Sequence, residues 1–171
     1  NDPITLKLRN LERKLFRTWC QWLCTPTTNS RQENKFKEHY QEVIKELESK
    51  LIHSGGPWLN ENRDNQDNTR PGSIDLIFIP FLERMNASLA YYKGFSLREE
   101  HPTIDKWLQA LELEEVYRGT QGDFHTHAHD LPPQMGGCWI SPNDKQKQYS
   151  LAIDEGEGLG KNEINCENLN L

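Results

Sequence analysis

Apolar side chains recur every three or four residues along the first half of this chain, which is the spacing of one face of an α-helix. The pattern runs through residues 4–23 and again through residues 36–51, with turn-forming residues between them. A third helix is predicted over residues 72–92, whose first half has no polar face and is therefore expected to be surrounded by protein. A fourth is predicted to begin near Pro102, since proline suits the first turn of a helix.

The helical period ends near Gly119. Residues 122–139 are rich in His, Pro and Gly, and residues 141–171 are rich in Asn, Glu and Gly with isolated apolar residues. No strand-like alternation longer than a few residues occurs. We therefore predict an all-α protein, with a helical bundle domain over residues 1–119 and a largely irregular extension and tail over residues 120–171.

Charge and hydropathy narrow the classes of partner. The 171 residues carry 26 acidic and 20 basic side chains, a formal net charge of −6, which argues against a nucleic-acid-binding protein. No apolar stretch reaches the roughly 20 residues of a membrane span, so we expect a soluble protein, for which peripheral association with a membrane complex stays open. The four cysteines lack the spacing of a disulfide framework, which favours a reducing compartment.

Four short motifs, in this order, carry a resemblance to a known family. They are Gly-Gly-Pro-Trp-Leu at 55–59, Gly-Ser-Ile-Asp at 72–75, Pro-Phe-Leu-Glu-Arg-Met at 80–85 and Pro-Thr-Ile-Asp-Lys-Trp at 102–107. Over residues 4–119 the chain resembles the C-terminal helical domain of the glutathione S-transferase superfamily. The segment Thr-His-Ala-His-Asp-Leu-Pro-Pro-Gln at 126–134 is similar to an extension in a cyanobacterial and plant subgroup, which implies a plastid or cyanobacterial cytoplasm.

The resemblance implies a division of labour. In this family a separate thioredoxin-like domain binds glutathione and activates its thiol, whereas the helical domain supplies an apolar wall for the electrophilic co-substrate and part of a dimer surface. No strand-helix-strand pattern precedes residue 4. We therefore expect no catalytic residue here, and glutathione as a cofactor only together with such a domain. The alternative is a non-catalytic scaffold or binding subunit of a larger, photosynthetic assembly.

The resemblance also assigns a structural role to Asp75. It places Gly72 at the N-cap of the central helix and Asp75 at the third helical position. A carboxylate there accepts hydrogen bonds from free backbone N–H groups and is favoured by the helix dipole. Because Gly72 has no side-chain acceptor, Asp75 is expected to carry most of this cap.

Two surfaces of the first helix are candidates for binding. Phe16, Cys20 and Leu23 form a second apolar strip, which is interpreted either as the co-substrate wall or as ordinary helix packing. Cys20 is not predicted to be a nucleophile, because apolar surroundings raise the pKa of a thiol.

An arginine row lies along the same helix. Arg9, Arg13 and Arg17 follow one another at four-residue steps. The row is interpreted either as a solvated face or as a docking surface for an acidic protein partner, a second copy included.

Three histidines alternate at positions 125, 127 and 129. In an extended segment His125, His127 and His129 would point the same way and converge on a metal ion, with Asp130 as an outer carboxylate. No fourth ligand is evident in the sequence. We therefore assign no metal site and interpret the segment as a docking or structural element.

Overall fold

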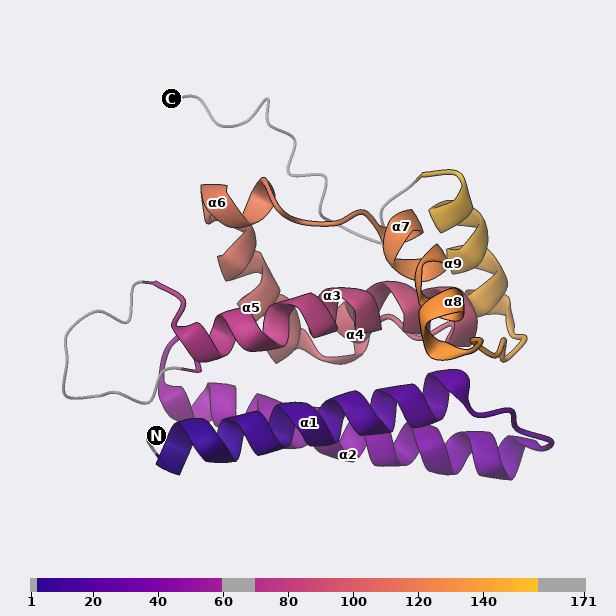
Figure 1. The fold of residues 1–171 in the computed structure, drawn as a ribbon, viewed down its shortest axis with the longest axis horizontal. Coiled ribbons are helices and arrows are strands. Elements are labelled where there is room, and N and C mark those ends of the chain that lie inside the picture. Colours follow the sequence, from indigo (N-terminus) through magenta and orange to yellow (C-terminus); the bar gives the residue numbers. More distant parts are fainter. Residues whose placement is uncertain (1–2, 60–69, 157–171) are drawn as a thin grey trace.

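The computed structural model describes residues 3–59 and 70–156, and helices dominate both parts. Two long helices, α1 (Pro3–Cys24) and α2 (Ser30–Ser54), run antiparallel along one side of the molecule. The central helix α3 (Ser73–Lys93) lies over this pair (Figure 1). Among the described residues no strand occurs, so the all-α prediction is confirmed.

Three further helices follow. They are α4 (Leu97–Glu100), α5 (Pro102–Glu112) and α6 (Glu115–Arg118). Of these, hydrophobic periodicity predicted only α5. We call α1 to α5 the body. Its core is made of large side chains from α1, α2, α3 and α5 that are almost fully buried, among them Trp19, Trp22, Tyr40, Phe78 and Trp107. Such a core is the main source of stability in a bundle.

Local signals explain where the body helices start and stop. The Asn29 side chain accepts a hydrogen bond from the Gln32 N–H and so caps the start of α2. Gly55 and Gly94 end α2 and α3 in the left-handed conformation, with φ of 72° and 66°, which glycine adopts without a steric penalty. The chain then turns back on itself at each position.

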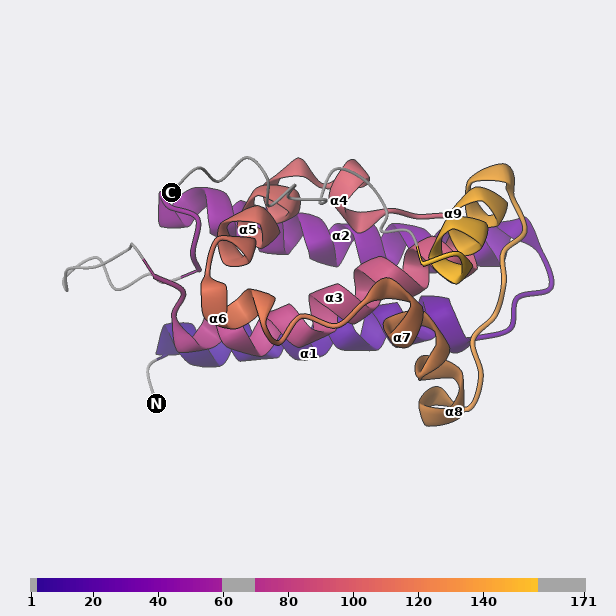
Figure 2. The same ribbon diagram turned by 90° about the horizontal axis from the view of Figure 1, so that it is seen from above.

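The prediction of an irregular extension after Gly119 is wrong for residues 124–154. Instead of an irregular segment, the structure has α7 (Phe124–His129), α8 (Leu131–Met135) and α9 (Asp144–Asp154). These helices form a layer beside the C-terminal half of α3, as Figures 1 and 2 show. We call α7 to α9 and their connections the C-terminal layer.

The physical reason is that the layer needs few apolar residues. Asp123 and Asn143 cap α7 and α9, and each accepts a hydrogen bond from a backbone N–H three residues on. A small second core joins the layer to α3, made of Ala90, Ala128, Tyr149 and Ile153. Docking onto α3 thus stabilises helices whose own pattern is weak. The predicted tail beyond residue 156 lies outside the described residues.

Candidate functional site

The first candidate surface lies where α1 meets α3. The rings of Phe16 and Phe81 meet edge to face with centroids 5.5 Å apart, and both side chains are half-buried. The Arg13 guanidinium lies 5.3 Å from the Phe16 centroid and 5.2 Å from the Phe81 centroid. Cys20 follows one turn after Phe16 and is also half-buried. We call Arg13, Phe16, Cys20 and Phe81 the seam.

Arg13 is held in the seam by a buried acid. Glu12 is 2% exposed, and the Arg13 Nε donates to Glu12 Oε2 at 2.6 Å while a terminal nitrogen bonds Oε1. The hydrogen bonds that Arg13 donates to Glu12 raise the pKa of Arg13 above its usual value. The Arg13 guanidinium is thereby paired with an acid of its own helix. In this it differs from the other two members of the predicted arginine row.

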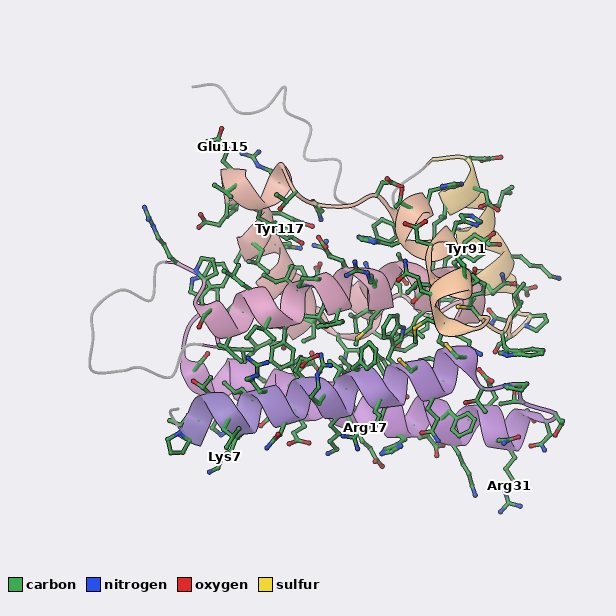
Figure 3. All side chains as sticks on the ribbon, in the orientation of Figure 1. Lys7, Arg17, Arg31, Tyr91, Glu115 and Tyr117 are labelled. Atoms are coloured by element: carbon green, nitrogen blue, oxygen red, sulfur yellow. The ribbon has the colours of Figure 1, made fainter. Side chains whose placement is uncertain are left out.

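The other two members of the row are exposed. Within the described residues, Arg9 and Arg17 form no ion pair. Arg17 lies on the outer side of α1, as does Lys7 (Figure 3). Two cations on α1 are therefore available to an acidic surface.

The three residues of the predicted apolar strip on α1 also differ in burial. Leu23 is fully buried, and its backbone carbonyl accepts a hydrogen bond from the Trp139 N–H at 2.9 Å. Leu23 therefore belongs to the core and to the attachment of the C-terminal layer. Phe16 and Cys20 remain partly accessible, and Phe16 meets Phe81, a contact that the sequence did not indicate.

Three thiols lie at the C-terminal end of α1. Burial raises the pKa of Cys20 to about 12. A hydrogen bond from Cys138 lowers the pKa of Cys24, with the Lys93 ammonium contributing in the same direction. The pKa of Cys138 is raised, because its proton is held by Cys24. Cys24 is therefore the thiol most easily ionised of these three, and Cys20 is unsuited to act as a nucleophile at neutral pH.

A polar group next to these thiols joins α2, α3 and the C-terminal layer. Lys93 is buried, and its Nζ lies 3.1 Å from Glu33 Oε1 and 3.1 Å from the Ser141 hydroxyl. Glu33 also accepts hydrogen bonds from Trp22 Nε1 at 2.7 Å and from Ser141 at 2.6 Å. Although burial opposes ionisation of Glu33, these hydrogen bonds and Lys93 lower its pKa overall. The group therefore holds an ion pair inside the protein.

Asp75 occupies the place that the sequence assigned to it. Gly72 is the N-cap of α3, and the Asp75 Oδ2 accepts a hydrogen bond from the Gly72 N–H at 2.8 Å. Its Oδ1 accepts two more, from the Leu59 N–H at 2.8 Å and from Trp107 Nε1 at 3.0 Å. Burial raises the pKa of Asp75 despite these bonds. Asp75 thus joins three segments of the body and faces no open site.

The histidine segment differs from the extended geometry expected for it. Because α7 is a helix, His125 and His129 lie on one side of it, with ring centroids 4.3 Å apart, and face Asp154 of α9. His127 lies on another side, with its Nε2 3.8 Å from Glu83 Oε2. The His-x-x-x-His spacing was visible in the sequence, whereas the approach of Asp154 was not.

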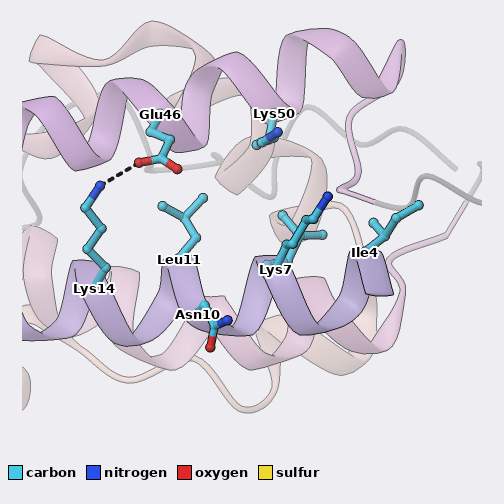
Figure 4. A pocket seen from close by; sticks show the side chains of 8 residues that line it. Ile4, Lys7, Asn10, Leu11, Lys14, Glu46 and Lys50 are labelled. Atoms are coloured by element: carbon cyan, nitrogen blue, oxygen red, sulfur yellow. Dashed lines mark hydrogen bonds and ion pairs between the residues drawn. The ribbon is translucent and has the colours of Figure 1, made fainter. Parts of the chain in front are cut away.

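A shallow hollow lies between the first half of α1 and the second half of α2 (Figure 4). Three lysines, Lys7, Lys14 and Lys50, line it beside Leu11. Lys14 is paired with Glu46, whose carboxylate lies 2.8 Å from the ammonium. Neither Phe16 nor Cys20 lines this hollow. Its charge suits a weakly held anion rather than an apolar electrophile.

Two searches of the chain, one for membrane-spanning helices and one for known relatives, give negative results. No helix in the described part of the chain is long and apolar enough to cross a bilayer. No family model, no curated protein and no solved structure matches this chain.

Proposed function

We propose that this chain is the helical, co-substrate-side domain of a glutathione S-transferase-like protein. The seam, in which Phe16 and Phe81 stay half-exposed beneath Arg13, carries the proposal. An aromatic surface of this kind binds flat apolar molecules by stacking and excludes water from them. The bonds of Asp75 to Gly72, Leu59 and Trp107 support the resemblance on which the proposal rests, because they tie together three of its four motifs.

In the proposed reaction a thiolate attacks the electrophile, and this thiolate is not one of the chain's own described side chains. Cys20 has a raised pKa, and no described side chain at the seam is placed as its general base. Glutathione and its activation therefore belong to a thioredoxin-like domain, and the seam would orient and desolvate the electrophile. The subgroup resemblance points to a plastid or a cyanobacterial cytoplasm.

The natural full-length protein tests this role. It should bind immobilised glutathione and conjugate glutathione to 1-chloro-2,4-dinitrobenzene. Phe81→Ala should raise the KM for the electrophile by about tenfold, because it removes half of the aromatic surface, and leave the KM for glutathione unchanged.

Phe36→Ala is the matched control, since Phe36 is a half-buried aromatic residue on α2. An equal effect of the two substitutions would contradict the assignment of the seam. Absence of both glutathione binding and turnover would contradict the transferase-like function itself.

A second candidate function has an observation of its own. Arg9 and Arg17 are exposed on α1, and within the described residues they pair with no acidic side chain. In a protein of net charge −6, two such cations favour docking of an acidic protein surface, either a different subunit or a second copy. The chain would then be a binding subunit of a larger assembly.

Charge reversal separates the two functions. Replacing both Arg9 and Arg17 by Glu should weaken self-association or subunit binding by about tenfold or more, measured by sedimentation at low salt. Arg31→Glu, which changes an exposed arginine on α2, is the control (Figure 3). Unchanged association in the double variant would exclude this surface.

A further inference from the structure

Two histidines of α7 and one aspartate of α9 come together at the surface of the C-terminal layer. One ligand atom from each of His125, His129 and Asp154 lies within 4.8 Å of the other two. We propose that these three side chains bind a divalent transition-metal ion of the zinc class. The site is independent of the seam and of the proposed transferase-like function.

The helix fixes the first two ligands. His125 and His129 are four residues apart on α7, so their side chains project from the same face. Their rings are 4.3 Å apart and tilted by 40°, with exposed side chains that can rotate. Zinc binds imidazole nitrogen at about 2.0 Å, which places two tetrahedral ligands about 3.3 Å apart. A small rotation of each ring therefore suffices to bring both nitrogens to one ion.

The third ligand is already in contact. The His129 Nε2 lies 2.8 Å from Asp154 Oδ1, so a hydrogen bond joins the two side chains. A zinc ion would take the place of the hydrogen-bonded proton, because a ligating imidazole must present its lone pair. The carboxylate balances part of the charge of the ion, and water completes the coordination at this exposed position.

Tyr91 orients this carboxylate from behind. Its hydroxyl donates a hydrogen bond to Asp154 Oδ2 at 3.1 Å, which leaves Oδ1 for the metal. The Tyr91 ring also meets the His129 ring edge to face, with centroids 5.0 Å apart. One side chain of α3 thus positions two of the three ligands, as outer partners do in protein metal sites. Tyr91 is a positioning residue and not a ligand.

The placement of negative charge also calls for a cation. His129 is the last residue of α7, and Asp154 is the last residue of α9. The C-terminal end of a helix carries partial negative charge, which disfavours a carboxylate and favours a cation. Asp130 and Glu155 follow directly in the sequence and add further acidic charge. A divalent ion would neutralise this charge and join α7 to α9.

The donor set distinguishes the class of metal. Two imidazoles and one carboxylate suit zinc and its transition-metal neighbours, whereas magnesium and calcium prefer oxygen ligands alone. The ligands come from both α7 and α9, so a bound ion would fasten these two helices to each other. The expected consequence is a C-terminal layer that is more stable with zinc than without it.

Zinc titration of the tag-free full chain tests the proposal. In competition with a chromophoric chelator, the protein with its thiols blocked by alkylation should bind one zinc ion per chain. His129→Ala and Asp154→Asn should each weaken zinc binding by at least about 100-fold, and Tyr91→Phe by about tenfold. Zinc should also raise the melting temperature of the parent protein and not that of His129→Ala.

Two controls make the result specific. His39→Gln removes an exposed histidine of α2 and should leave zinc affinity unchanged. Thiols also bind zinc, and Cys24→Ser removes one of them. This substitution should not alter the zinc affinity measured after alkylation. Circular dichroism checks that each variant is folded, which is expected because His129 and Asp154 are exposed.

Three results would overturn the proposal. Absence of zinc binding by the parent protein would remove the site. Equal affinity in the parent protein and His129→Ala would place the ion elsewhere. Binding of magnesium in preference to zinc would contradict the imidazole ligands.

Discussion

The body and the C-terminal layer are both helical, yet different interactions hold them. The body buries large apolar side chains from four helices around α3. The layer shares a small core with α3, centred on Tyr149 and Ile153, and adds only Leu131 to the buried residues of the body's core. Burial energy grows with apolar area, so the body is expected to be much the more stable of the two.

The layer compensates with directed hydrogen bonds to the ends of the body helices. The Ser141 N–H donates to the Tyr92 carbonyl at 2.8 Å, and the Asn143 Nδ2 donates to the Lys93 carbonyl at 3.0 Å. The Gln146 Nε2 donates to the Tyr91 carbonyl at 2.8 Å. Such contacts specify a position rather than supply much stability. We therefore expect the layer to open locally while the body stays folded.

The largest expected effect is a loss of stability in the body. Asp75→Ala leaves the N–H groups of Gly72, Leu59 and Trp107 without their acceptor. We expect the free energy of unfolding to fall by about 3 kcal/mol, measured by urea denaturation, because each orphaned buried donor costs about 1 to 3 kcal/mol and the raised pKa of Asp75 offsets part of the loss. Asp75→Asn keeps one acceptor oxygen and should lose less.

A loss below about 0.5 kcal/mol for Asp75→Ala, which is typical of an inconsequential surface change, would contradict a structural role for this carboxylate.

The next effect separates the layer from the body. Gly94→Ala forces a side chain into the left-handed conformation, and its Cβ would lie 2.5 Å from Asn143 Oδ1 and 2.6 Å from the Gln146 N. Gly55→Ala is the matched control, with similar φ and open space around the Cβ. We expect losses of about 2 to 3 kcal/mol for Gly94→Ala and about 1 kcal/mol for Gly55→Ala.

Hydrogen exchange distinguishes where the loss falls. Amides of α9 should exchange faster in Gly94→Ala, while those of α1 and α2 keep their protection. Equal losses in the two glycine variants would show that the contact with the N-cap of α9 is unimportant.

A pH effect tests the ion pair between the two regions. Because the pKa of Glu33 is lowered from 4.5 on folding, its contribution is fully present above pH 4.5 and is lost as the pH falls through the folded value. Glu33→Gln leaves Lys93 buried without its counter-charge, so we expect a loss of about 2 kcal/mol at pH 7. The difference between the two proteins should shrink below pH 4.5.

Glu38→Gln, at an exposed position of α2, should leave the pH dependence of urea denaturation as it is in the parent protein. A constant difference between parent and Glu33→Gln from pH 7 to pH 3 would contradict the lowered pKa.

The smallest effect is a difference in the reactivity of the thiols, which also reports on opening of the layer. At pH 8, Cys24 should be alkylated by iodoacetamide faster than Cys20, whose pKa is raised to about 12 by burial. In Gly94→Ala the alkylation of Cys138 should accelerate more than that of Cys20, because Cys138 belongs to the layer. Peptide mass spectrometry resolves each site. Equal rates for Cys20 and Cys24 would contradict the thiol environments described above.

Prediction from the sequence succeeded where one segment carried its own signal. The spacing of Leu8, Leu11, Leu15, Trp19 and Trp22 is enough to predict α1, because all five point to one side of a helix. The place of Asp75 at the start of α3 is likewise a local feature. The α9 segment carries no such signal, since Tyr149 and Ile153 are the only apolar residues of its buried face and their partners lie on α3 and α7.

The candidate sites show the same limit. Phe16 and Cys20 were visible as a strip, but their neighbour Phe81 lies 65 residues further along the chain than Phe16. His125 and His129 carry a visible spacing, whereas Asp154 and Tyr91 have no sequence feature that links them to these histidines. Contacts between residues far apart in sequence leave no periodic trace.

The sequence by itself determined that the chain forms helices, which faces of them are apolar and where several of them are capped, because these properties depend on residues within one or two turns. Only the tertiary structure decided that Arg13 turns back onto Glu12 and two rings, that Leu23 belongs to the core, and that two helices of the layer present His125, His129 and Asp154 to one point. The reason is that packing selects one arrangement of the helices, and side-chain chemistry at a site depends on that arrangement.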